Sequence, residues 1–109
     1  MSALIRKQIS FIRLLSETKS KLQKNALLDT ITRDQIKAII EITYNVLHLN
    51  VPVSKTDKKK LVKHITLLKE IGTKKNSQKK IAALLKQHKS IVVLLIKAVL
   101  PAIDSLMQK

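Results

Sequence analysis

Apolar residues recur along most of the chain at spacings of three, four and seven, which is the pattern of amphipathic helices. The pattern predicts five helices, at about residues 3–27, 33–48, 55–71, 77–88 and 90–107. One glycine and two prolines leave little room for the tight turns of β-hairpins. We therefore expect an all-α fold, a small bundle of four to five helices that forms a single helical domain over residues 1–109.

The first predicted helix has a broad apolar face. Its basic residues fall largely on other sides of the helix, as amphipathic packing requires. The apolar stripe consists of Ile5, Ile9, Ile12, Leu15, Leu22 and Ala26.

Side-chain caps mark the ends of the middle helices. Thr32 is a candidate N-cap with Gln35 three residues later, as in a capping box. Pro52 ends that helix, because it lacks an N–H and favours an extended residue before it. Ser54 is the next candidate N-cap, and Asp57 stands at the third helical position, where an acid suits the helix dipole.

The boundary between the third and fourth predicted helices is marked by a glycine. Gly72 occupies the position at which a left-handed C-cap residue is expected. The following helix is expected to begin at Asn76 or Ser77.

The C-terminal segment is the most apolar part of the chain. Residues 91–96 are all aliphatic, and because no other segment offers a strand to pair with, they predict a buried helix that kinks or restarts at Pro101. A bilayer span needs about 20 apolar residues, and Lys97 interrupts this run, so we do not expect a transmembrane helix. The residues expected in the core or at a dimer seam are Ile91, Val92, Leu94, Leu95 and Val99.

The charge of the chain is strongly unbalanced. It contains 22 basic and seven acidic residues, for a net charge of +15. Twelve lysines and only two acids lie between Ser54 and Lys89, whereas an ordinary soluble surface mixes the two signs. A single lysine run would indicate a solvated helix face. Three successive basic clusters (KTDKKK, TKKNSQKK and KQHK) favour a surface that binds a polyanion.

The type of basic residue indicates how such a surface would bind. Only three of the 22 basic residues are arginine, the residue that reads guanine through paired hydrogen bonds. Lysine is a compact charge suited to phosphate oxygens, and the two aromatic residues, Phe11 and Tyr44, lie outside the basic region. The sequence predicts contact with a nucleic-acid backbone, without sequence preference, through Lys55, Lys58, Lys59, Lys60, Lys63, Lys74, Lys75, Lys79, Lys80, Lys86 and Lys89.

The remaining polar residues do not form a recognisable catalytic or metal-binding pattern. His48, His64 and His88 are separated by 16 and 24 residues, and we interpret them as helix-end, surface and partly buried residues respectively. The acids are scattered, there is no cysteine, and there is no glycine-rich phosphate loop. We therefore expect no enzyme activity, no cofactor and no metal. The absence of cysteine and of a signal-peptide pattern also favours an intracellular protein.

Residues 26–106 resemble a family of small basic virion proteins encoded by Maverick/Polinton-type (adintovirus) elements, which are similar to the small core protein precursor of adenoviruses. The resemblance is carried by ALLDTITRDQIKAIIEITYNVLHLNVPVS, KKKLVKHITLLKEI, NSQKK and IAALLKQHKSIVVLLIKAVLPAIDSL. The family tends to have two glycines before its leucine-rich end, where this chain has His88, Lys89 and Ser90. The resemblance implies a DNA-binding or DNA-condensing structural protein of the virion core or host nucleus, with capsid proteins as partners.

Three functions stay open from the sequence. The first is a non-catalytic protein that binds double-stranded DNA, or RNA, through phosphates. The second is a membrane-active or membrane-surface protein in which residues 90–107 insert their apolar face and the lysines meet anionic lipid. The third is a basic module that docks an acidic protein. Residues 90–107 could also join copies of the chain into a homo-oligomer.

Overall fold

The computed structural model describes residues 2–73 and 76–107, and within them it is entirely helical. The helices are α1 (Ala3–Lys7), α2 (Ile9–Glu17), α3 (Lys21–Asp29), α4 (Arg33–Leu47), α5 (Lys55–Val62), α6 (Ile65–Gly72), α7 (Gln78–Gln87) and α8 (Lys89–Met107). The all-α prediction is confirmed. The predicted count of four to five helices is wrong, because the described residues form eight.

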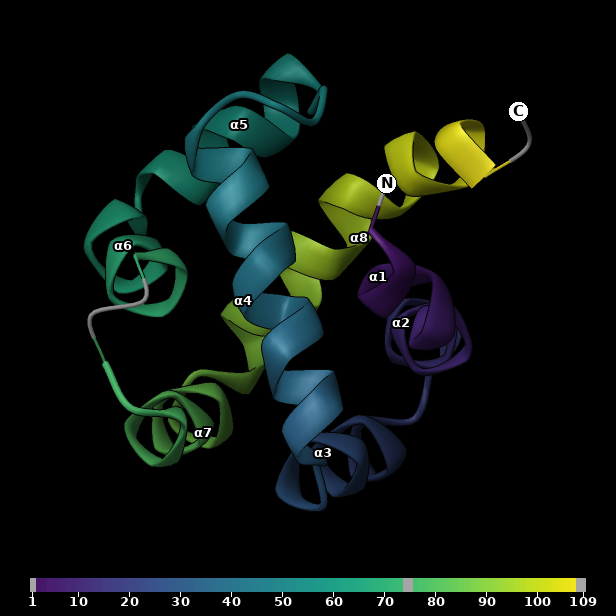
Figure 1. Cartoon of the computed structure of the whole chain (residues 1–109), viewed down its shortest axis with the longest axis vertical. Coiled ribbons are helices and arrows are strands. Elements are labelled where there is room, and N and C mark those ends of the chain that lie inside the picture. The colour runs from purple at the N-terminus through teal and green to yellow at the C-terminus, as the bar shows by residue number, and fades with distance from the viewer. Residues whose placement is uncertain (1, 74–75, 108–109) are drawn as a thin grey trace.

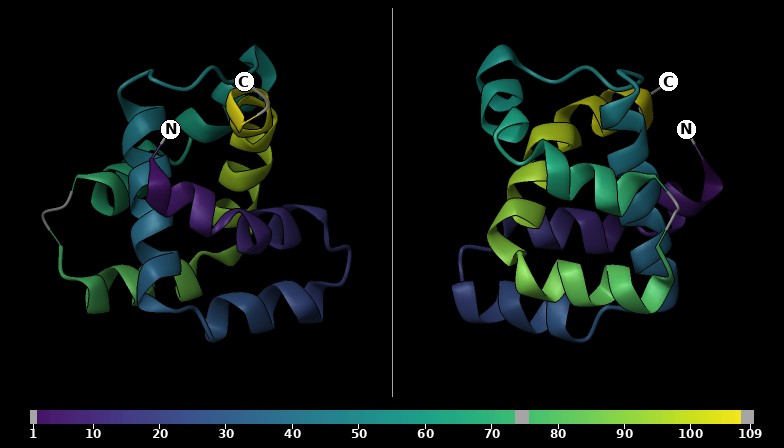
Figure 2. Two further views of the ribbon diagram at one scale, coloured as in Figure 1. Left: turned by 45° about the vertical axis from the view of Figure 1, so that its right-hand side comes forward. Right: turned by 90° about the vertical axis from the view of Figure 1, so that its left-hand side faces the viewer.

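Helices α4 and α8 run through the middle of the molecule, and the shorter helices pack around them (Figure 1). Helix α4 contacts α1, α6, α7 and α8, while α8 also contacts α2, α3 and α5. Along one side of the molecule α6, α7 and α3 are stacked one below another (Figure 2). A single cluster of buried apolar side chains takes members from all eight of these helices.

The predicted helix at 3–27 is divided into three. An unbroken helix of 25 residues would be about 37 Å long, which exceeds the longest dimension of the molecule, 32 Å. The chain turns first at Gln8 and again at residues 18–20, where the Ser20 hydroxyl accepts a hydrogen bond from the Gln23 amide at 3.2 Å. Ile5, Ile12 and Leu15 are buried as expected, but Leu22 is 82% exposed because α3 has a different orientation.

The predicted helix at 55–71 is divided into α5 and α6. The break at Lys63 and His64 has no proline or glycine to mark it, and the Leu68 amide bonds to the His64 carbonyl, so the helix restarts at once. The break lets the two halves pack on different helices, with α5 against α8 and α6 against α4. Leu61 and Leu68 are buried on either side of it.

The predicted caps are largely confirmed. Thr32 and Gln35 form the capping box, and Ser54 accepts from the Asp57 amide at 3.2 Å. Ser77 is the N-cap of α7, while the Asn76 side chain donates to the Glu70 carbonyl at the end of α6. Helix α4 ends at Leu47, one residue before the predicted boundary.

Gly72 is not the left-handed cap that the sequence predicted. It is the last residue of α6, is buried, and has no positive φ. A Cβ atom at this position would lie 2.8 Å from Leu47 Cδ1, 3.1 Å from Thr43 Cγ2 and 3.1 Å from the Tyr44 backbone nitrogen. Glycine is therefore required because α4 and α6 approach each other closely here.

The C-terminal segment forms the long core helix α8, which continues through Pro101 without restarting. Val92, Leu95 and Val99 are buried in the core of a single copy of the chain, and Ile91 and Leu94 are partly buried. Proline has no N–H, so Pro101 cannot donate the usual helical hydrogen bond to the carbonyl of Lys97 one turn earlier. Both residues are exposed.

Replacement of Gly72 by alanine should destabilise the protein, although alanine is the better helix former by about 1 kcal/mol. The added Cβ meets the α4 backbone at Tyr44, so we expect a net loss of about 1–3 kcal/mol from overpacking. Urea-induced unfolding measures this loss, with the exposed neighbour Thr73→Ala as the control. A Gly72→Ala variant at least as stable as wild type would contradict the close approach.

Replacement of Leu95 by alanine should cost about 2–5 kcal/mol in the free energy of unfolding, because the side chain is only 1% exposed. Leu106→Ala is the matched control on the same helix, where the leucine is 40% exposed. It should cost about half a kcal/mol or less. Similar losses for the two variants would mean that α8 is not anchored through its buried face.

Candidate nucleic-acid interface

The structure divides the predicted phosphate-binding lysines between two ends of the molecule. Helix α5 and the residue after it carry Lys55, Lys58, Lys59, Lys60 and Lys63, which we call the α5 surface. Helix α7 carries Lys79, Lys80 and Lys86, and Lys89 begins α8. Helices α5 and α7 lie near opposite ends of the long axis (Figure 1). The two remaining predicted residues, Lys74 and Lys75, lie outside the described residues.

Two lysines of the second group, Lys86 and Lys89, belong to a groove that the sequence did not predict. Lys79 and Lys80, in the first turn of α7, do not line it. The N-terminal half of α3 forms one wall, and the junction of α7 and α8 forms the other. The groove has a volume of about 620 Å³. Its lining includes five lysines, which we call the lysine groove: Lys19, Lys21, Lys24, Lys86 and Lys89.

Neutral polar groups complete the lysine groove. Asn25, Gln87 and Ser90 line it between the lysines, and Val93 of α8 contributes an apolar surface. Side-chain amides and hydroxyls are common ligands of phosphate oxygens, alongside lysine. The groove therefore offers both charge and hydrogen-bond donors to an anion.

The tertiary fold creates this groove from segments that are about 60 residues apart. The turn at residues 18–20 redirects the chain, so that α3 packs against α7 and α8. Lys21 and Lys24 are three residues apart and therefore share one side of α3. This spacing is the only local signal that could have indicated Lys19, Lys21 and Lys24. The charge distribution along the sequence does not single them out, because they lie outside the lysine-dense region.

The lysine groove concentrates positive charge. Partial loss of solvation lowers the pKa of Lys24 below its ordinary value of 10.5, and the like charge of Lys97 lowers it further. Lys97 lies one turn beyond Val93 on α8 and so extends the row of lysines. Asp29 is paired with Lys89 at 2.8 Å and offsets part of the charge at the other end of the groove.

Most of the positive charge has no carboxylate partner within the protein. Among residues 2–73 and 76–107 the ion pairs are Lys89–Asp29 and Arg13–Asp104. The second pair ties α2 to α8, and Arg33 donates to the Gln78 side chain at 3.1 Å, which ties α4 to α7. Two of the three arginines thus serve the fold, and the uncompensated charge is carried mainly by lysine.

The histidines lie at helix ends, in agreement with the sequence interpretation of His48. His48 is the C-cap of α4; its ring stacks on Tyr44 at 4.0 Å and its Nδ1 lies 2.9 Å from the Tyr44 carbonyl oxygen. His64 precedes α6, and His88, which is partly buried, follows α7. Within the part of the chain that the structure describes, no three His, Asp or Glu side chains are grouped to hold a metal ion.

Helix α8 is long and apolar enough to cross a membrane, contrary to the expectation that the segment is too short. Length and composition are weak indications, because core helices of soluble proteins have the same properties. Half of the relevant window is buried inside the fold. In this structure the helix serves as the core.

Comparisons with known proteins add no function. No family model matches the chain, and neither a curated protein nor a solved structure matches it. The resemblance to virion core proteins therefore stays a prediction.

The lowered pKa of Lys24 predicts a specific pH dependence of stability. Lys24 keeps its proton to a higher pH in the unfolded chain than in the folded protein, so its positive charge destabilises the folded state. This destabilisation decreases as the pH rises from the lowered pKa to 10.5. Urea unfolding of wild type and Lys24→Gln should show that wild type gains stability relative to the variant over that interval. Lys37→Gln on α4 controls for the loss of one exposed charge. A constant or falling difference for Lys24→Gln would contradict the prediction.

Proposed function

We propose that this is a non-catalytic protein that binds nucleic acid through its phosphates, without sequence preference. The observation that carries the proposal is the lysine groove, in which two segments of the chain, residues 19–25 and 86–93, converge to present five lysines opposed by one carboxylate. Like charges that a fold brings together repel one another, and an anionic ligand relieves that repulsion. A polyanion also gains affinity from the counterions that it releases.

The side chains available favour backbone contact over base reading. Phe11 is buried in the core and cannot stack on a base, while Tyr44 lies on α4 outside the lysine groove. Single-strand binders usually offer exposed aromatic platforms. Double-stranded DNA is therefore the ligand we favour, and RNA, which carries the same phosphates, is the alternative.

Two basic surfaces on one molecule suggest how the protein would condense DNA. Helix α5 lies near one end of a molecule 32 Å long, and helices α3 and α7, which carry most lysines of the lysine groove, lie near the other end (Figure 1). This length is several times the screening length of about 8 Å at physiological salt, so the two surfaces act independently. One monomer could then hold two segments of duplex together. Such bridging suits the virion core or host nucleus implied by the resemblance, with capsid proteins as further partners.

The other two functions are less well supported by the arrangement of the chain. Insertion of α8 into a membrane requires it to leave the core, with Leu95 and Ile96 among its fully buried residues. Docking of an acidic protein would use the same lysines as nucleic acid. It predicts only weak binding to DNA and no bridging of two duplexes, so the experiments below separate the two functions.

Binding to a random-sequence duplex at several salt concentrations tests the proposal. Lys21, Lys24 and Lys86 changed together to glutamine should weaken binding and make the slope of log K against log salt shallower by about 0.9 per lost phosphate contact. Lys55, Lys59 and Lys63, which are spaced by four residues along α5, form a second triple variant. The control triple is Lys7, Lys37 and Lys69, which has the same loss of charge outside both surfaces.

Bridging is measured by energy transfer between two differently labelled duplexes. Wild type and the control triple variant should bring the two duplexes together. The triple variant of the lysine groove and that of the α5 surface should each still bind one duplex and lose bridging. Equal salt slopes for all four proteins would remove both surfaces from the interface. Retained bridging in both surface variants would show that condensation does not depend on two ends of one molecule.

A further inference from the structure

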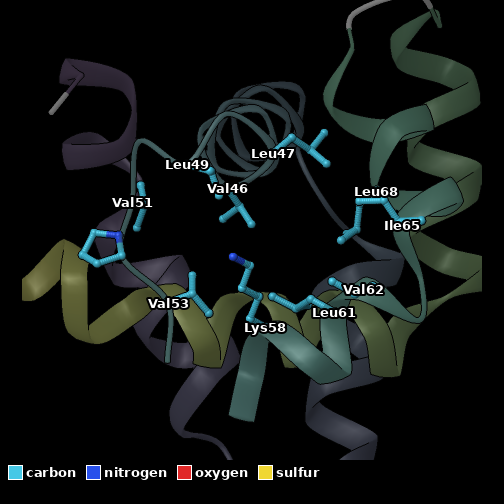
Figure 3. Close-up of a pocket in the computed structure, with 11 residues that line it drawn as sticks. Val46, Leu47, Leu49, Val51, Val53, Lys58, Leu61, Val62, Ile65 and Leu68 are labelled. Atoms are coloured by element: carbon cyan, nitrogen blue, oxygen red, sulfur yellow. The ribbon is translucent and has the colours of Figure 1, made fainter. Parts of the chain in front are cut away.

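A second, chemically different cavity lies beside the α5 surface. It has a volume of about 310 Å³ and lies between the end of α4, the segment 49–53, α5 and α6 (Figure 3). Ten of its eleven lining residues are apolar, and the eleventh is Lys58. The apolar residues are Val46, Leu47, Leu49, Val51, Pro52, Val53, Leu61, Val62, Ile65 and Leu68.

Lys58 is turned toward this cavity. Its side chain rises from α5 toward Val46, with the amine among the apolar side chains that line the space (Figure 3). Within the described residues its amine forms no ion pair or hydrogen bond with the protein. A lone cation facing apolar walls is complementary to a ligand with an apolar body and one negative group.

The rim of the cavity keeps apolar side chains open to solvent. Leu49 is 76% exposed and Val62 is 54% exposed. Leu49 also has a φ of 57°, the left-handed conformation that is unfavourable for leucine by roughly 1–2 kcal/mol. Leu49 occupies the position at which glycine normally ends a helix. Its amide donates to the Val46 carbonyl, and the Asn50 amide donates to the Asn45 carbonyl, which together form a Schellman motif.

The exposed side chain of Leu49 adds little to the core, and a glycine would make the same backbone hydrogen bonds without the strain. Strained residues persist where the surrounding structure enforces them, and they are concentrated at ligand sites. Here the strain places an apolar side chain at the mouth of the cavity. The unpaired charge and the strained wall are independent features of the same space.

We propose that this cavity binds a medium-chain anionic amphiphile, a fatty acid of about eight carbons, with its tail against the apolar walls and its carboxylate on the Lys58 amine. A volume of about 310 Å³ lies at the low end of the range for small-ligand sites, which suits a short amphiphile such as octanoate. A partner helix would instead need a longer groove for anchors on successive turns.

The charge around the cavity favours the entry of an anion. Lys55, Lys59 and Lys63 border a shallow depression on α5 that shares Lys58 and Val62 with the cavity. Clustered positive charge raises the local concentration of anions and their rate of association. Lys58 belongs to both the α5 surface and the cavity, but the apolar walls play no part in phosphate contact. The triple variants of the nucleic-acid experiment leave Lys58 unchanged, so the two proposals are tested separately.

The test is a titration of the whole protein with octanoate, and separately with 1-octanol, followed by the methyl NMR signals of Val46, Val53 and Leu61. Octanoate should shift these signals saturably, and it should bind more tightly than the alcohol. Lys58→Met should weaken octanoate by about tenfold and leave the alcohol unchanged. Lys60→Met is the matched control, because it removes one charge from α5 without touching the cavity.

A second variant tests the apolar walls without endangering the fold. Val62→Phe places a larger side chain at an exposed rim position, so it should fold normally and weaken octanoate and octanol alike. Three results would overturn the proposal: no saturable shift of the cavity methyl groups, equal octanoate affinity in wild type and Lys58→Met, or shifts confined to the lysine groove. Each result leaves the salt-slope experiment on nucleic acid unaffected.

Discussion

The burial of α8 is the constraint on which the rest of the structure depends. Its aliphatic face would be a large apolar surface in water, and burying such surface stabilises a fold by about 25 cal/mol per Å². A chain of 109 residues has limited material with which to cover a helix of 19 residues. It does so with α4 at the centre and short helices around both, and the breaks at residues 18–20 and 63–64 follow from that requirement.

The same arrangement determines where the positive charge goes. Apolar residues occupy the inward faces of the helices, so the lysines are displaced to the outside, where seven acids cannot compensate 22 basic residues. A net charge this far from zero opposes compaction through self-repulsion. The pKa of Lys24 is lowered first by partial loss of solvation and then by the like charge of Lys97, and the second contribution is a local sign of that repulsion. Anionic ligands that bind the folded protein would therefore also stabilise it.

The lysines are not equivalent once the fold is known. Those in the lysine groove face one another across two walls, those at positions 55, 59 and 63 line one side of α5, and Lys58 faces an apolar cavity. Lys89 is paired with Asp29 and joins the start of α8 to the end of α3. Residues of one type, adjacent in the sequence, thus have different surroundings and different proposed ligands.

The sequence alone determined the all-α class, the caps at Thr32 and Ser54 and the burial of Val92, Leu95 and Val99, because these depend on local hydrogen bonds and on helical periodicity. It determined the excess of charge but not its distribution. The helix break at His64, the role of Gly72 and the convergence of Lys21, Lys24 and Lys86 depend on residues far away in the chain. Gly72 shows the reason most clearly: a left-handed cap and a close helix contact both favour glycine, and only the position of α4 distinguishes them.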